Sequence, residues 1–167
     1  GFFTVQQKEL TSVSKLLAVC YMFVGGSPAS TAGGIKTVTL GVIILLVINY
    51  IKGREEISVF NREISIASIN RAIVVICISI FIIIVSISLL IISENFKYEK
   101  DIDIQQSANI YLSVVDIVFE VVSAFATVGL TLGITSKLTL VGKLIIISLM
   151  IIGRLGPITI SIALFKK

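Results

Sequence analysis

The sequence contains no histidine, and it has only two cysteines among its 167 residues. Without histidine, the chain has no histidine-ligated metal site and no histidine general base. Cys20 and Cys77 both lie inside apolar runs, where a cysteine is expected to act as a small buried hydrophobic residue. Two such thiols provide neither a disulfide framework nor metal-ligand spacing. With no nucleophile–base pair and no phosphate-binding glycine motif after a strand, we do not expect an enzyme.

Charged residues are also scarce, at 14% of the chain, whereas hydrophobic residues make up 56%. Residues 72–92 run for 21 positions without a charge. About 20 apolar residues are needed to cross a bilayer core of roughly 30 Å, so this run predicts a transmembrane span. The alternative is a buried helix of a soluble protein. The chain begins at Gly1 with no initiator methionine and no signal peptide, and we therefore expect a piece of a longer polypeptide.

A second apolar stretch, Val13–Tyr50, is too long for one straight span, because its 38 residues would form a helix of roughly 57 Å. The glycine-rich segment Gly25–Gly34 divides it into a half-helix, a loop and a second helix. Lipid offers no hydrogen-bond partner to non-helical backbone, which is tolerated only inside protein or along a watery cavity. An interrupted membrane helix is therefore a pointer to an ion or substrate pathway.

The remaining apolar segments complete a helix, re-entrant loop and helix. We expect a span at 72–93, a pore helix at 110–126, a filter at 127–133 and a span at 137–165. The alternative for residues 110–133 is a fourth full span. The predicted fold class is an all-α membrane protein of helix–pore loop–helix repeats of the potassium-channel type, with one broken transmembrane helix.

Basic residues set the expected orientation, because short cytoplasmic loops are enriched in lysine and arginine. The loop 52–71 has four basic residues, and the chain ends in Lys166-Lys167. The loop 94–109 has four acidic and two basic residues. We therefore expect a multi-pass plasma-membrane protein with loop 52–71 and the C-terminus in the cytoplasm. A solvated basic face without a partner is the alternative for that loop.

Four residues, Thr127, Val128, Gly129 and Leu130, have the character of a potassium filter. Such a filter replaces the hydration shell of the ion with backbone carbonyl oxygens. Glycine allows the required backbone torsions because it lacks a Cβ atom. Three residues in common with the Thr-Val-Gly part of the channel signature are a weak match alone. Their position after a short amphipathic helix and before another span strengthens it.

The chain resembles the Trk/Ktr-type potassium uptake transporters, which are related to the plant high-affinity potassium transporters. The resemblance rests on four segments along the chain: GFFTV at the start, MFVGGSPASTAGGIKT at 22–37, FEVVSAFATVGLTLG at 119–133 and MIIGRLGPITISIAL at 150–164. In order, they are similar to the end of the third filter, the gating loop of the third repeat, the fourth pore helix with its filter, and the closing helix. Ala29 and Ala126 stand where family members often have glycine.

The resemblance implies that residues 1–51 end the third of four repeats, that 52–71 is a cytoplasmic loop and that 72–167 is the fourth repeat. Gly1 and Gly129 would be two of four filter glycines, coordinating K⁺ at filter carbonyls, with Na⁺ as a second candidate ion. The loop at about 25–36 would obstruct the pore, and Arg154 with Lys36 would repel cations. A structural anchor is the alternative for Arg154, and a helix boundary for Lys36. The predicted gate residues are Gly25, Gly26, Ser27, Pro28, Ala29, Ser30, Thr31, Ala32, Gly33, Gly34, Lys36 and Arg154.

Partners also follow from the resemblance. It implies membrane lipid around the spans, a homodimer and a cytoplasmic nucleotide-binding regulatory subunit docking on the side of loop 52–71. No nucleic acid is expected. The predicted function is the pore-forming part of a potassium uptake transporter. The alternative is a non-conducting membrane remnant or an assembly subunit, because one and a half repeats cannot encircle an ion.

Overall fold

The computed structural model describes residues 6–28, 30–53, 58–59, 62–100 and 114–156. For residues 58–59, 62–63 and 95–100 it describes the backbone alone. Several predicted features fall outside these ranges. They are the filter residue Gly1, the gate residue Ala29, the start of the pore helix at 110–113 and the end of the last span at 157–165.

Two helices flank the glycine-rich segment. After the short 3-10 helix η1 (Gln7–Glu9), helix α1 spans Ser12–Phe23 and helix α2 spans Thr37–Ile51. The Thr11 side chain caps α1 by accepting a hydrogen bond from the Ser14 N–H. Between the two helices the described backbone of 24–28 and 30–36 is non-helical, and this segment contains the predicted break.

The longest element follows a small hairpin. Strands β1 (Ser58–Val59) and β2 (Arg62–Glu63) pair antiparallel, and helix α3 then spans Ile66–Lys100. At 1.5 Å per residue its 35 residues extend over roughly 53 Å, so it continues beyond the predicted span at both ends. Among the described residues, one helix is long and apolar enough to cross a membrane, namely the part Ile66–Glu94 of α3. Helices α1 and α2 are shorter apolar helices.

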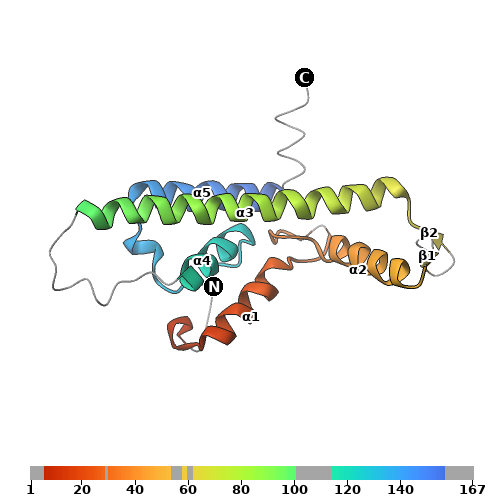
Figure 1. Cartoon of the computed structure of the whole chain (residues 1–167), viewed down its shortest axis with the longest axis horizontal. Coiled ribbons are helices and arrows are strands. Elements are labelled where there is room, and N and C mark those ends of the chain that lie inside the picture. Colours follow the sequence, from red (N-terminus) through yellow and green to blue (C-terminus); the bar gives the residue numbers. More distant parts are fainter. Residues whose placement is uncertain (1–5, 29, 54–57, 60–61, 101–113, 157–167) are drawn as a thin grey trace, which may run out of the picture.

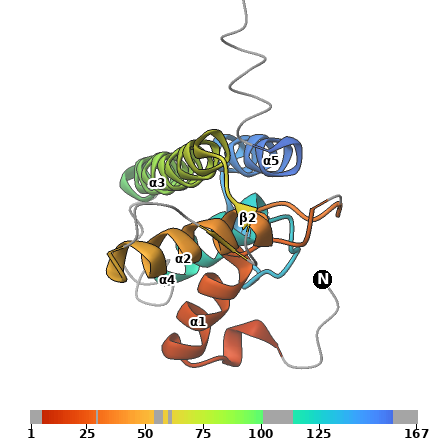
Figure 2. The same ribbon diagram turned by 90° about the vertical axis from the view of Figure 1, so that its right-hand side faces the viewer.

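The last third of the chain forms helix α4 (Val114–Phe125), the short η3 (Thr135–Lys137) and helix α5 (Leu140–Leu155). Figures 1 and 2 show α3 and α5 side by side in one layer, with α4 beneath both of them and α1 beneath α4. Helix α2 lies along the other part of α3, toward the hairpin. Apart from the two-residue strands, every described element is helical, which confirms the prediction of an all-α fold.

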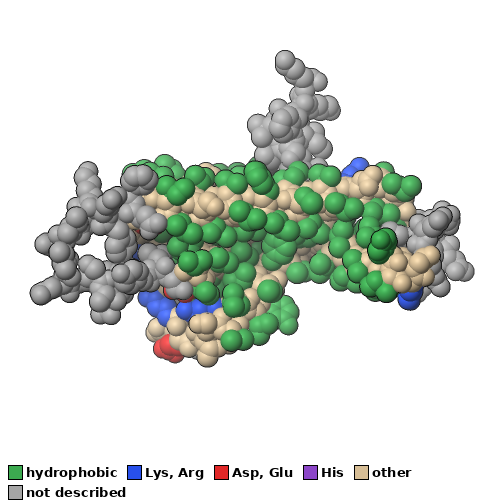
Figure 3. Space-filling model, viewed as in Figure 1, with side chains coloured by type: hydrophobic (Ala, Val, Ile, Leu, Met, Phe, Trp, Pro, Cys, Tyr) green, Lys and Arg blue, Asp and Glu red, His purple; other side chains and the backbone are tan. Residues whose placement is uncertain are grey.

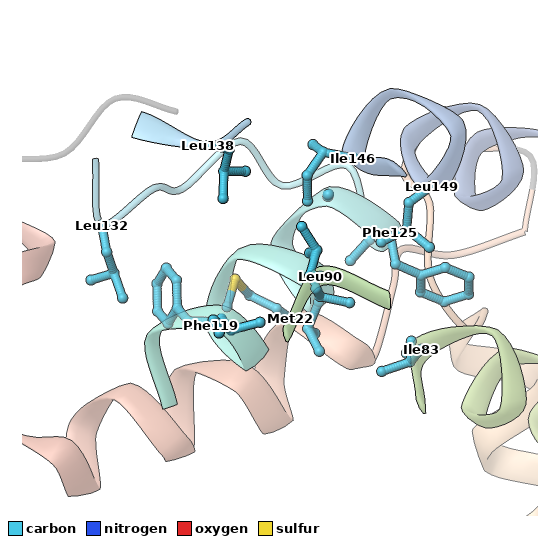
Figure 4. Close-up of a cluster of buried hydrophobic side chains, with 14 residues drawn as sticks. Met22, Ile83, Leu90, Phe119, Phe125, Leu132, Leu138, Ile146 and Leu149 are labelled. Atoms are coloured by element: carbon cyan, nitrogen blue, oxygen red, sulfur yellow. The ribbon is translucent and has the colours of Figure 1, made fainter. Parts of the chain in front are cut away.

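Helix α4 is the centre of the packing. Of its residues, Ile117 and all seven from Phe119 to Phe125 are buried. Phe119 and Phe125 have no exposed surface, and Leu90 from α3 and Leu149 from α5 pack around the same helix (Figure 4). Burial of this kind is expected for a short helix that is enclosed by neighbouring helices rather than lying at the surface.

By contrast, α3 and α5 expose apolar side chains along their outer faces. Phe81, Ile84 and Ile92 are exposed on α3, as are Leu144 and Ile151 on α5. In Figure 3, which shows the side of the molecule with α3 in front, hydrophobic side chains are spread along α3, whereas charged side chains gather near α1 and toward the hairpin end. A continuous apolar surface of this extent is unusual for a soluble monomer and suits contact with lipid or with further apolar helices.

Two polar contacts tie the helix ends together. Glu94 near the end of α3 is buried, and its Oε1 accepts hydrogen bonds from the N–H (3.0 Å) and the hydroxyl (2.9 Å) of Thr139, the N-cap residue of α5. The carboxylate thus lies at the positive end of that helix, where negative charge is favoured. On the other side, Lys15 of α1 forms a 2.9 Å ion pair with Asp116 in the first turn of α4.

Candidate functional site: a filter-like segment and the loop docked against it

The site begins at the C-terminal end of α4, where the chain reverses direction. The N–H of Val128 donates to the carbonyl oxygen of Ser123 (3.0 Å), and the N–H of Thr127 donates to that of Ala124 (3.1 Å). This pair of bonds is the Schellman motif of helix ends, in which the C′ residue takes a left-handed conformation. Thr127 occupies this position with a φ of 55°. A β-branched residue is strained there, so the surrounding contacts must hold it in place.

Beyond Thr127, the segment 127–133 is held from behind by α4. The Ser123 hydroxyl donates to the carbonyl oxygen of Leu130 at 2.6 Å. The buried Glu120 carboxylate accepts from the Leu132 N–H at 3.2 Å and also from the Thr131 hydroxyl. Glu120 thus supports the backbone of this segment. Sequence reasoning assigned no role to Ser123 and none to Thr131 beyond its place in the predicted filter at 127–133, because each is an ordinary hydroxyl residue until the fold brings it to its partner.

Three carbonyl groups at the start of the segment have no hydrogen-bond donor within the described part of the chain: those of Thr127, Val128 and Gly129. Gly129 has a φ of 84° and Gly133 a φ of 78°, so both use the conformational freedom of glycine. A carbonyl oxygen that is not already bonded is able to replace a water ligand of a cation. The predicted filter residues therefore form a contiguous, braced segment with unused oxygen ligands.

The glycine-rich loop is closed at its base by backbone hydrogen bonds. The Gly25 N–H donates to the Ile35 carbonyl at 2.7 Å, and the Ile35 N–H donates to the Phe23 carbonyl at 3.2 Å. A Cβ atom on Gly25 would lie 2.0 Å from the carbonyl oxygen of Gly33, so no other residue fits without displacing the backbone. The loop is therefore a compact structure with a defined base rather than a loose connection.

The Lys36 side chain turns back into this loop. Its Nζ donates to the carbonyl oxygens of Ala32 (2.7 Å) and Ser30 (3.1 Å). Lys36 is also the N-cap residue of α2, so the same residue marks a helix boundary and contacts the loop. The donor to these loop carbonyls is therefore Lys36.

Arg154 lies in the last turn of α5 with an exposed side chain, and within the described residues it has no hydrogen bond or ion pair. Its neighbour Gly153 makes the close contact instead. A Cβ atom on Gly153 would lie 1.8 Å from the carbonyl oxygen of Phe125, the last residue of α4. Helix α5 therefore approaches the end of α4 through this glycine, which sequence reasoning did not single out.

The loop and the filter-like segment are in direct contact. The Gly33 N–H donates to the Thr127 hydroxyl oxygen at 2.9 Å. A Cβ atom on Gly33 would lie 2.8 Å from the Phe125 carbonyl oxygen and 3.0 Å from Cγ2 of Thr127. Two predicted sites that are 94 positions apart in the sequence are thus parts of one site. The structure brings the gate residues Gly33 and Gly34 to the end of α4 and the start of the segment 127–133.

Comparison with known proteins shows the family of this chain. All residues 1–167 match the family described as TrkH, cation transport protein. The chain is similar to the potassium/sodium uptake protein NtpJ of Enterococcus hirae, with 36% identity over 167 residues that make up all of this chain and 34% of that protein. It is also similar to the Ktr system potassium uptake protein B of Bacillus subtilis, with 37% identity over 166 residues that cover 99% of this chain and 34% of the relative.

A third relative, the Ktr system potassium uptake protein D of Bacillus subtilis, is 32% identical over 167 residues, which are all of this chain and 34% of that protein. The chain therefore spans about a third of the length of these relatives. The similarity runs through the loop, the pore-helix-like α4 and the segment after it rather than being confined to one apolar helix. Since the family match includes every residue, the chain belongs to the TrkH family of cation transport proteins.

Proposed function

We propose that this chain supplies part of the pore of a potassium uptake transporter, with segment 127–133 as one of its filter loops and loop 24–36 as its gate. The observation that carries this proposal is the docking of Gly33 on Thr127 beside three carbonyl groups without a hydrogen-bond donor in the described chain. The relatives are potassium or potassium/sodium uptake proteins by name, which supports K⁺ as the transported ion and keeps Na⁺ as a second candidate.

The architecture of α4 supports the filter part of this proposal. The helix is enclosed by α1, α3 and α5, so its C-terminal end is held at a defined point within the protein. Partial negative charge at a helix C-terminus favours a cation nearby. Since this chain is about a third as long as its relatives, the remaining filter loops, including one ending at Gly1, would come from the rest of the transporter.

The loop supports the gating part. It is compact, it is held together by Lys36, and one hydrogen bond, from the Gly33 N–H to the Thr127 hydroxyl, joins it to the start of the filter segment. Displacing it would break this bond and the close packing of Gly33 on the end of α4. We propose Arg154 as a second cationic group of the gate. Its side chain is exposed, and it directly follows Gly153, the residue of α5 that contacts the end of α4. The membrane orientation, the homodimer and the cytoplasmic regulatory subunit stay predictions.

The test uses the complete transporter in potassium-uptake complementation, followed by uptake measurements with K⁺ and Na⁺. We expect Gly129→Ser to weaken discrimination between the two ions, because a side chain at a φ of 84° is strained and the carbonyls would move. Gly53→Ser is the matched control, since Gly53 also has a positive φ of 65° but has nothing near its Cβ position. Full discrimination in Gly129→Ser would refute the filter assignment.

The gate is tested by replacing residues 29–33 with a shorter linker, which we expect to raise ion flux in the same transporter. Unchanged flux would count against gating by the loop. The alternative function, a non-conducting remnant or assembly subunit, predicts no complementation by the complete protein while it is still present in the membrane. Ion flux in the variant with the shorter loop therefore tests the gate, and complementation by the complete protein tests the function.

A further inference from the structure

The contact between the loop and the filter segment depends on one side chain. The Thr127 hydroxyl is the acceptor for the Gly33 N–H, and the rest of that contact is the close packing of Gly33 on the end of α4. An N–H group without its acceptor in a buried site costs more than the bond itself contributes, because its hydration has been lost. The docked position of the loop is therefore favoured by this hydroxyl.

The surface beneath the loop is rigid. Gly33 lies against the Phe125 carbonyl, and Gly153 of α5 lies against the same carbonyl, with Cβ positions at 2.8 Å and 1.8 Å from its oxygen. Neither the peptide group nor the fully buried Phe125 side chain has room to follow a moving loop. When the loop leaves, the bond to Thr127 must therefore break rather than stretch.

The presence of threonine at position 127 also supports a role for its hydroxyl group in holding the loop. The C′ position of a Schellman motif favours glycine, and a threonine in its place is strained at a φ of 55°. A glycine would relieve the strain but would have no hydroxyl to offer Gly33. The threonine side chain thus provides a hydrogen-bond acceptor that the backbone turn itself does not require.

We propose that Thr127 is a latch that positions the gating loop and couples its displacement to ion binding in the filter segment. This inference rests on the proposed function. A cation coordinated by the neighbouring carbonyls would repel the partial positive charge of the Gly33 N–H. Filling of the filter therefore favours release of the loop, and by linkage a docked loop weakens ion binding to the same extent.

The experiment measures the position of the loop directly. In the complete transporter, reconstituted in vesicles of bacterial polar lipid, the exposed Thr31 of the loop is changed to cysteine after Cys20, Cys77 and any other cysteine have been replaced by serine. The rate of labelling by a small thiol reagent is compared in K⁺ and in choline. Uptake of radioactive rubidium is measured on the same vesicles.

We expect Thr127→Val to raise the labelling rate about 2- to 10-fold, which corresponds to the loss of one ordinary hydrogen bond. We also expect labelling of the parent to be faster in K⁺ than in choline, and this difference to shrink in Thr127→Val. Thr127→Ser keeps the hydroxyl and should restore both properties. Thr135→Val is the matched control, because it removes a threonine hydroxyl bonded to Thr131 rather than to the loop.

A second variant protects the test against misfolding of Thr127→Val. Gly33→Ala leaves Thr127 intact and forces the loop away from the Phe125 carbonyl, so it should also label faster. Labelling that is equal in the parent and in both variants, with rubidium uptake present, would overturn the latch alone. Absence of potassium-competed rubidium uptake in the parent would instead refute the proposed function, and the coupling with it.

Discussion

Gly153 of α5 lies directly against the carbonyl oxygen of Phe125, so closely that a Cβ atom at this position would be 1.8 Å from it. Phe125 is the last residue of α4 and has no exposed surface. The end of the central helix is therefore fixed between α5 on one side and Gly33 of the loop on the other. The segment that follows it begins from a point that cannot shift.

The first prediction concerns this contact. Gly153→Ala should destabilise the protein, because the obstructing atom is backbone and the two helices would have to separate; overpacking of this kind costs about 1–3 kcal/mol. The measurement is thermal unfolding of the purified complete transporter in detergent. Gly41→Ala in α2 is the control, since nothing lies within 4 Å of its Cβ position and alanine favours a helix. Equal melting temperatures for the two variants would contradict the close contact.

The second prediction concerns the support of the filter segment by Glu120. Glu120→Ala should lower discrimination between rubidium and sodium in uptake assays, because the Leu132 N–H would lose its acceptor, at a cost of about 1–3 kcal/mol. Glu120→Gln retains a side-chain oxygen and should keep most of the discrimination. If the glutamine variant were as impaired as the alanine variant, the negative charge of Glu120 would matter rather than its position as an acceptor.

The third prediction separates two roles of Lys36. Lys36→Met removes the donor to the carbonyls of Ser30 and Ala32, so the loop should open more often. Both a clamp and an electrostatic barrier predict higher ion flux, and flux alone does not distinguish them. Hydrogen exchange of the backbone at 24–36 does, since only loss of a clamp should accelerate it. Lys52→Met at the other end of α2 is the control, and unchanged exchange in Lys36→Met would favour the barrier.

Much of this site follows from local sequence patterns. The excess length of Val13–Tyr50 together with its glycines indicated a break, because a continuous helix would exceed the bilayer. The Thr-Val-Gly run and the amphipathic segment before it predicted a filter at 127–133, which stays a prediction. These are features of neighbouring residues, and their physical causes act over a few positions of the chain.

Contacts between segments that lie far apart in the sequence could not be predicted from local patterns. Lys15 and Asp116 are opposite charges in apolar surroundings, but nothing in their spacing of 101 positions predicts that they pair. Likewise, nothing in the sequence predicts that the Lys36 side chain turns back to the carbonyls of Ser30 and Ala32. A long cationic side chain reaches several acceptors, and only the folded backbone determines which of them lie within reach.

The amino-acid order by itself determined the apolar helices, the position of the break and the residues able to offer carbonyl oxygens, since hydrophobic length and glycine torsions are properties of short segments. Tertiary structure alone decided that the Gly33 N–H reaches the Thr127 hydroxyl and that Gly153 supports the same turn from behind. Such contacts arise from the packing of α4 between its neighbours, where differences of one ångström separate a hydrogen bond from none.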